Sequence, residues 1–250
     1  MLEENFIAGN SVLHHLDPRA KTIVACVFSI VVAISDRYAA LIPAVFVALS
    51  FMFVASLPVK KVFSRLLLIN IFIFFLWLFL PFTTKGRPLF SLGPLVASKE
   101  GVLYATMITL KSNAIILALM ALLATMSIFT MARALRYLHI PSKIVHLIFF
   151  TYRYIHVINQ EYRRLMNAIK IRGFSPGNNL HTYRTYAFLV GMLLIRSHDR
   201  AERVRAAMLC RGFRGKFYDL KDFSMRNMDY VVMFLMLFAT TGIALLQWIG

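Results

Sequence analysis

The sequence predicts an all-α membrane protein with about five transmembrane helices and a cytoplasmic pair of long amphipathic helices. Of its 250 residues, 59% are apolar and 16% are charged, whereas soluble domains average about 45–50% apolar and about 25% charged residues. This composition excludes an ordinary soluble enzyme and a disordered chain. The net charge is nevertheless +17. Because a charge at the bilayer centre costs about 2.5–3.5 kcal/mol, we expect the basic residues to lie outside the lipid.

Five apolar runs are candidates for membrane spans, each of which needs about 20 residues. They cover residues 22–35, 39–57, 66–82, 112–132 and 230–249. The first run is short and Asp36-Arg37 follows it, which favours a tight helical hairpin with the second run. The alternative is one long, bent helix over 22–57. The segment before the first run is polar, and its two glutamates, Glu3 and Glu4, are unlike a secretory signal.

The basic residues are concentrated in one segment. Residues 126–226 hold 18 Lys and Arg against 5 Asp and Glu. The positive-inside rule places this segment, the N-terminus and the short segment 58–65 in the cytoplasm. We therefore expect a multi-pass protein of the plasma (inner) membrane with three regions: 1–132, 133–226 and 227–250. Region 133–226 is the cytoplasmic one.

Lys111 and Asn113 lie near the start of the fourth run. An ionisable group within a membrane is a candidate functional group. The simpler interpretation, which we favour, is that the Lys111 side chain extends to the outer interface.

The basic segment is predicted to contain two helices rather than a long loop. From Ile155 to Ile169 the apolar residues recur at steps of three and four, which is typical of one helical stripe. The first helix should begin after Pro141 and end near Gly173, because Pro176-Gly177 follows. A second helix should run from about 182 to 212. Its apolar stretch, 186–195, is too short for a sixth span and is expected to pack against a neighbour or lie at the interface.

The two helices end in an internal repeat with an offset of 39 residues. Residues 164–174 align with 203–213, and Arg, Ala, Arg, Gly and Phe coincide. A glycine just past a helix end can adopt the left-handed conformation, and an arginine in the last turn faces the negative end of the helix dipole. Two well-capped helices are one complete interpretation. The other is a pair of like contacts with a two-fold symmetric or pseudo-symmetric partner, made through bidentate guanidinium groups.

Several motifs are absent from the sequence. It contains no Gly-x4-Gly-Lys-Ser/Thr, so we expect no ATP bound through a P-loop. No Cys pair has zinc spacing. The two cysteines, Cys26 in an apolar run and Cys210 in a basic run, imply no disulfide framework. We expect no metal ligands and no catalytic residues in this chain. Nucleic-acid binding is disfavoured because the arginine-rich helices are tethered to membrane spans.

Three stretches carry a resemblance to a known family. His15-Leu-Asp17-Pro18-Arg19-Ala-Lys21 resembles the amino-terminal signature of the transmembrane T component of energy-coupling-factor (ECF) ABC transporters, the EcfT/CbiQ family. The Arg-Gly endings at 172–173 and 211–212 resemble its two Ala-Arg-Gly coupling motifs. The stretch 207–215 is most similar to the cobalt/nickel, CbiQ-like branch. One departure is that Ile171 and Cys210 stand where the family has alanine.

The resemblance implies a division of labour among partners. Two ABC ATPase subunits would hold ATP and Mg and would dock on the helix tips, and a separate membrane subunit would bind cobalt or nickel. The present chain would carry no cofactor and would couple hydrolysis to uptake. The residues implied in coupling are the arginines and glycines of the two endings and the alanine four residues before each arginine: Arg172, Gly173, Arg211, Gly212, Ala168 and Ala207.

Alternatives remain at this point. The cargo could be a vitamin, with the chain serving several binding subunits. A membrane enzyme acting on an anionic substrate is a weaker alternative, because each acid in the two helices has basic residues within a turn for ordinary pairing. The segment Asp17-Pro18-Arg19 is a candidate contact for the substrate-binding subunit. It also fits a helix start, with Asp as N-cap and Pro at the first helical position, and the two interpretations are compatible.

Overall fold

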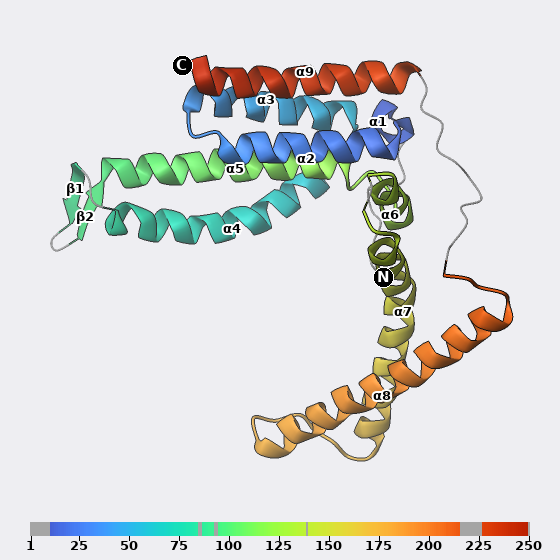
Figure 1. Cartoon of the computed structure of the whole chain (residues 1–250). Helices are drawn as coiled ribbons and strands as arrows, with labels where there is room; N and C mark the ends of the chain where they lie inside the picture. The colour runs from blue at the N-terminus through green and yellow to red at the C-terminus, as the bar shows by residue number, and fades with distance from the viewer. Residues whose placement is uncertain (1–10, 85–86, 93–94, 139, 216–226, 250) are drawn as a thin grey trace. The chain divides into compact units, whose positions relative to one another are not determined.

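The computed structural model describes residues 11–84, 87–92, 95–138, 140–215 and 227–249. The chain divides into two compact units (Figure 1). We call the first, Met1–Ile140 with Phe223–Gly250, the membrane unit. We call the second, Pro141–Asp222, the helix-pair unit. Each is described by itself.

Helices build almost all of the described part of the membrane unit. They are α1 (Val12–His15), α2 (Pro18–Ile34), α3 (Tyr38–Val54), α4 (Val59–Thr83), α5 (Lys99–Leu122), α6 (Ile128–Tyr137) and α9 (Asn227–Ile249). Three of them, α4, α5 and α9, are long and apolar enough to cross a bilayer, and the apolar helices α2 and α3 have 17 residues each. The prediction of an all-α membrane protein is confirmed. The hairpin is confirmed too, because α2 ends at Ile34 and α3 begins at Tyr38.

The fourth predicted run, 112–132, had the wrong boundaries. α5 begins at Lys99 and ends at Leu122, and the run continues into the separate helix α6. The break has local causes that apolarity does not reveal. The Thr125 hydroxyl donates to the Ala121 carbonyl at 3.1 Å, and Ser127 caps α6 by accepting from the Thr130 backbone N–H at 3.1 Å.

The correct boundaries place Lys111 and Asn113 in the middle of α5. The Lys111 ammonium lies 2.7 Å from the Asp36 carboxylate and donates to the Ala33 carbonyl at 3.0 Å. It therefore reaches the polar turn between α2 and α3. Asn113 exchanges two amide hydrogen bonds with Asn70 of α4, at 3.1 and 3.2 Å.

A short hairpin, which the sequence analysis did not predict, joins α4 to α5. Its strands, β1 (Pro88–Leu92) and β2 (Leu95–Ser98), pair antiparallel with Phe90 opposite Ala97. The sequence between them is Gly93-Pro94, a turn-forming pair. The pattern is too short to distinguish from a loop by periodicity.

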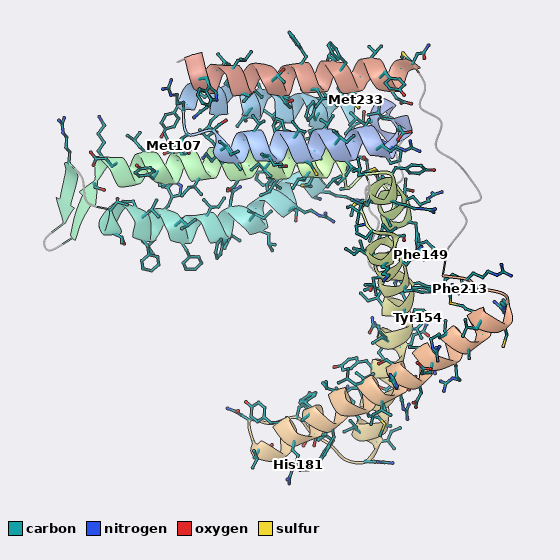
Figure 2. All side chains as sticks on the ribbon, viewed as in Figure 1. Met107, Phe149, Tyr154, His181, Phe213 and Met233 are labelled. Atoms are coloured by element: carbon teal, nitrogen blue, oxygen red, sulfur yellow. The ribbon has the colours of Figure 1, made fainter. Side chains whose placement is uncertain are left out.

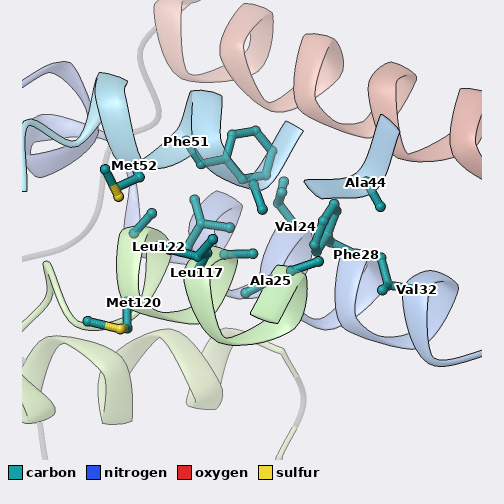
Figure 3. Close-up of a cluster of buried hydrophobic side chains, with 14 of the residues drawn as sticks. Val24, Ala25, Phe28, Val32, Ala44, Phe51, Met52, Leu117, Met120 and Leu122 are labelled. Atoms are coloured by element: carbon teal, nitrogen blue, oxygen red, sulfur yellow. The ribbon is translucent and has the colours of Figure 1, made fainter. Parts of the chain in front are cut away.

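The core of the membrane unit lies among α2, α3, α5 and α9, which run side by side (Figure 1). Small residues let the helices approach closely, which is the usual basis of helix association in membranes. The buried alanines of this core are Ala25, Ala40, Ala44, Ala48, Ala55, Ala114, Ala118 and Ala121. Phe28 and Phe51 fill the space between them edge to face, with ring centroids 5.8 Å apart (Figure 3).

The helix-pair unit consists of α7 (Ser142–Ile171) and α8 (Leu180–Cys210), which cross one another (Figure 1). Both predicted helices are confirmed, and the stretch 186–195 lies within the continuous helix α8. Asn179 caps α8 by accepting from the Thr182 N–H at 2.9 Å. Among the residues described in this unit, only Val145, Thr182 and Leu189 are buried. The pair therefore has almost no core of its own.

Candidate functional site

The first Arg-Gly ending closes α7 with a Schellman motif. Gly173 has φ +82°, in the left-handed region where glycine carries no Cβ penalty. Its N–H donates to the Lys170 carbonyl at 3.0 Å, and the Phe174 N–H donates to the Ile169 carbonyl at 3.3 Å. These two bonds satisfy carbonyls that the helix end would otherwise leave without donors.

The second ending repeats this geometry at the end of α8. Gly212 has φ +76°, its N–H donates to the Leu209 carbonyl at 2.9 Å, and the Phe213 N–H donates to the Met208 carbonyl at 3.0 Å. The preceding arginines match as well: Arg172 has φ −80° and ψ 13°, and Arg211 has φ −87° and ψ 12°. The 39-residue sequence repeat is therefore a repeat of backbone conformation.

Arg172 and Arg211 are exposed. Among the described residues no carboxylate pairs with either guanidinium. Ala168 and Ala207 are also exposed and lie one helical turn before the arginines, on the same side of each helix. Small side chains there leave room for a partner to approach the guanidinium. Ile171 and Cys210, the departures from the family pattern, are exposed too.

A groove lies between α7 and α8, next to the second ending. It encloses a volume of about 980 Å³ and is lined by apolar residues of both helices: Phe150, Tyr154, Val157, Ile158, Leu193, Val204 and Met208. Phe213, which follows Gly212, also lines it; Figure 2 labels Tyr154 and Phe213. Five arginines line it as well: Arg196, Arg200, Arg203, Arg205 and Arg214. Its chemistry is thus apolar surface combined with positive charge.

One ion pair joins the two helices along this groove. Glu161 of α7 accepts a hydrogen bond from the Arg196 guanidinium of α8, and Arg164 lies 3.5 Å from its other carboxylate oxygen. The bond from Arg196 holds the pKa of the Glu161 carboxyl below its ordinary value, against a smaller opposing effect of burial. Glu202 forms a local pair with Arg205 in α8, which lowers its pKa similarly. Both acids are thus used in ion pairs.

This groove was not predicted from the sequence. Of the predicted stripe from Ile155 to Ile169, Ile158 lines the groove, whereas Ile155 and Tyr162 do not and are exposed. Most of the α7 lining belongs to a second stripe, in which Phe150, Tyr154, Val157 and Glu161 recur at steps of four, three and four. That spacing was available as a signal. What it could not reveal was which stripe α8 would cover.

The amino-terminal signature lies in the membrane unit, at the start of α2. The Asp17 carboxylate accepts from the Arg19 backbone N–H at 2.8 Å, and Pro18 occupies the first helical position. The interpretation as a helix start is confirmed. Asp17 is buried, whereas Pro18 and Arg19 are partly exposed. The contact with a substrate-binding subunit stays a prediction.

Among the described residues, no group of three or more His, Cys, Asp or Glu is placed to hold a metal ion. The candidate site consists of the exposed arginines, the two helix ends and the apolar groove.

Comparison with known proteins adds a family match. Residues 9–220 match the CbiQ family, described as "Cobalt transport protein". This match covers most of the chain and includes both Arg-Gly endings and the amino-terminal signature.

Curated relatives are similar over nearly the same extent. The chain is 27% identical over 221 residues to the "Energy-coupling factor transporter transmembrane protein EcfT" of Thermosediminibacter oceani, covering 84% of this chain and 83% of the relative. Proteins of the same name from Leuconostoc gelidum and Listeria innocua are 29% and 28% identical. These matches cover 84% and 86% of this chain and 82% and 85% of the relatives.

Proposed function

Because the chain belongs to the CbiQ family, we propose that it is the transmembrane coupling subunit of an energy-coupling-factor ABC transporter. In this proposal two ABC ATPase subunits bind the helix-pair unit and hydrolyse ATP with Mg. A separate membrane subunit binds the substrate. The present chain catalyses nothing and transmits the ATP-driven movement from the first partners to the second.

The observation that carries the proposal is the pair of like helix ends. Two endings with matching backbone conformation can make the same contact twice, which suits two ATPase subunits related by a two-fold or pseudo-two-fold axis. Each ending presents an exposed guanidinium without a carboxylate partner in the described part of the chain. A guanidinium can bind carboxylate or backbone carbonyl groups through two parallel hydrogen bonds. In this proposal Arg172 and Arg211 are therefore the anchors.

The groove supports a wider contact at the second ending. Its apolar residues can bury the apolar face of a partner segment, and its arginines favour acidic residues on that segment. Arg203 and Arg214 belong to the same end of the unit as Arg211. We therefore expect the ATPase surface that receives this ending to be acidic and partly apolar.

The remaining parts supply the membrane anchor and the lever. The apolar helices α4, α5 and α9 have the length to span a bilayer. Residues 133–226 face the cytoplasm in this proposal, where the ATPases would reach them. α7 and α8 have 30 and 31 residues, so each can act as a lever roughly 45 Å long.

For the cargo we propose cobalt or nickel ions, carried by a separate substrate-binding subunit. The family description names cobalt. A second candidate is a coupling subunit shared among vitamin-type transporters, because the names of the relatives specify no cargo. Purification of the tagged chain from native membranes would distinguish the two. A metal-binding membrane subunit among the co-purified partners supports the first, and several different vitamin-binding subunits support the second.

The coupling role is tested with the double variant Arg172→Ala/Arg211→Ala. We expect substrate uptake to be lost and co-purification of the ATPases to fall sharply, because both anchors are removed while the helices remain. The matched control is Arg163→Ala, an exposed arginine of α7 that lies nine residues before Arg172 and outside the groove. It should bind the ATPases and transport normally.

Normal uptake by the double variant would refute the anchoring role. Failure of the wild-type chain to retain any ATPase in gentle detergent would refute the proposed function as a whole. Turnover of an anionic substrate by the purified chain alone would revive the enzyme alternative.

A further inference from the structure

The start of α2 holds three buried charged side chains at a contact between two helices. Lys21 is 1% exposed, Asp17 is 5% exposed and Asp229, in the first turn of α9, is 8% exposed. Charged groups are rarely buried in membrane bundles, because removing them from water is costly unless they are paired. Such a cluster therefore needs a physical account.

The three groups form one buried cluster. The Asp17 backbone N–H donates to the Asp229 carboxylate at 3.3 Å, across 212 residues of sequence. Burial is the largest influence on the Lys21 ammonium and disfavours its charge, whereas the carboxylates of both aspartates favour it. Each aspartate also lies at the N-terminus of a helix, α2 or α9, where the helix dipole favours negative charge. The cluster thus connects the start of α2 to the start of α9.

The intervening residue makes a different connection. The Arg19 guanidinium carbon lies 3.4 Å from the centroid of the Tyr137 ring, in a close cation–π contact. Tyr137 is the last residue of α6. The segment from Asp17 to Lys21 therefore contacts α9 through its first residue and α6 through its middle one, and the Asp229 charge of α9 also acts on Lys21.

These contacts involve the two helices, α6 and α9, that precede and follow the helix-pair unit in the sequence. α6 ends three residues before Ile140, the last residue of that stretch of the membrane unit, and α9 begins four residues after Phe223, where the unit resumes. Everything between them is the helix-pair unit. The polypeptide thus passes from one unit to the other after α6 and returns before α9, and each of these two helices contacts the start of α2.

We propose that Asp17, Arg19, Lys21, Tyr137 and Asp229 form a positioning clamp that makes α6 and α9 move with α2 as one body. The clamp rests on the proposed coupling function. Without the clamp, movement of the helix-pair unit would displace α6 and α9 separately and would be lost within the membrane unit. With it, the movement is delivered to α2 and the core that α2 shares with α3 and α5. In this proposal the amino-terminal signature transmits the movement of α6 and α9 to α2.

The test uses the complete transporter in proteoliposomes, with the ATP hydrolysis rate and substrate uptake measured on the same preparation. The variants are Tyr137→Leu, which removes the ring from Arg19, and Lys21→Met, which removes the charge between the aspartates. The matched control is Tyr137→Phe, which keeps the ring. We expect both variants to retain the ATPases and to hydrolyse ATP, while uptake per ATP falls on the order of tenfold, the usual size of a coupling between sites. Tyr137→Phe should transport normally.

Unchanged uptake per ATP in both variants would overturn the clamp. Equal loss of hydrolysis and uptake, or loss of the ATPases, would overturn it too, because that pattern indicates a merely structural role. Tyr137 is 37% exposed, so its variant keeps the experiment interpretable should Lys21→Met fold poorly.

A second readout uses the chain alone and does not depend on the proposed function. Spin-label distances between α2 and α6 and between α2 and α9 should be narrowly distributed in the wild type. They should broaden between α2 and α6 in Tyr137→Leu and between α2 and α9 in Lys21→Met. Unchanged distributions would overturn the clamp even if coupling were established. Broadened distributions in a chain that binds no ATPase would leave the clamp standing and refute the coupling function.

Discussion

The membrane unit and the helix-pair unit are both helical, but they are stable for different reasons. The membrane unit buries a continuous core of alanines and larger apolar residues among α2, α3, α5 and α9. The helix-pair unit buries three of its described residues and leaves large apolar side chains such as Phe188 and Ile195 exposed. The membrane unit also exposes large apolar side chains, such as Phe72 and Phe79 of α4, but it does so around a buried core. The two units therefore differ in the core that each buries, and exposed apolar surface without such a core is typical of an interaction site.

The largest effect on stability should come from truncating a buried phenylalanine of the membrane unit, and an exposed phenylalanine of the helix-pair unit is the comparison. Phe28 is fully buried and contacts Phe51, whereas Phe188 is 70% exposed. Phe28→Ala should destabilise the chain by about 3–5 kcal/mol, the usual cost of such a cavity. Phe188→Ala should leave its stability in detergent nearly unchanged. Thermal unfolding of the purified chain measures both, and a large loss from Phe188→Ala would break the comparison.

A smaller effect is expected where α5 begins against the end of α4. A Cβ on Gly101 would lie 2.7 Å from the Pro81 Cα and 2.8 Å from the Leu80 carbonyl oxygen. Neither backbone atom can yield without moving α4, so Gly101→Ala should cost about 1–3 kcal/mol. The control is Gly191→Ala in α8, where nothing lies within 4 Å. Unfolding midpoints in the same detergent test the pair, and equal midpoints would contradict the close approach.

Substitutions at the glycine caps should affect the helix-pair unit through conformation rather than space. Nothing lies within 4 Å of a Cβ at Gly173 or Gly212, but both have positive φ. Alanine there should cost about 1–2 kcal/mol of local stability, and asparagine, which tolerates this conformation better, should cost less. ATPase affinity of Gly212→Ala and Gly212→Asn is the measurement. Equal affinity of both variants to the wild type would show that the cap geometry does not matter for docking.

The amide pair between α4 and α5 should contribute less still. Asn70 and Asn113 exchange two hydrogen bonds, and such bonds between membrane helices average about 0.6 kcal/mol. Asn70→Leu combined with Asn113→Leu should therefore change the unfolding free energy only slightly. The single variants should cost more than the double, because each leaves an amide facing leucine. A double-mutant cycle tests this order, and additive losses would contradict the pairing.

The smallest effect concerns pH. The Arg196 hydrogen bond lowers the pKa of Glu161 from its ordinary value of 4.5. The pair therefore stabilises the α7–α8 contact fully above the ordinary pKa, and this contribution disappears as the pH falls through the lower, folded value. We expect the protection of backbone amides at this contact against hydrogen exchange to be constant above about pH 5.5 and to decrease below about pH 4.5.

Glu161→Gln should remove that acid-dependent change. The matched control is Glu202→Gln, whose partner Arg205 lies in the same helix, and it should leave the change in place. An acid-dependent loosening that persists in Glu161→Gln would show that another group is responsible.

Features set by interactions between residues close in sequence were predictable, and features set by contacts between distant residues were not. The ends of α7 and α8 were predictable because Pro141, Gly173 and Gly212 act within one turn. The break after Leu122 was not, because only hydroxyl residues interrupt the apolar run up to Ala132, and the side-chain bonds of Thr125 and Ser127 leave no periodic signal. The helix start at Asp17 was predictable as a cap. Its contact with Asp229 was not, because 212 residues separate them and nothing in either segment names the other.

The two glycine-capped endings have a consequence for which partner subunits the chain can bind. One polypeptide presents the same terminal geometry twice, from two helices that differ in most other residues. Two helix ends of the same geometry can bind two identical surfaces. A single kind of ATPase subunit present in two copies would satisfy both ends as well as two distinct ones. Duplication and divergence of the ATPase could then proceed while this chain remained unchanged.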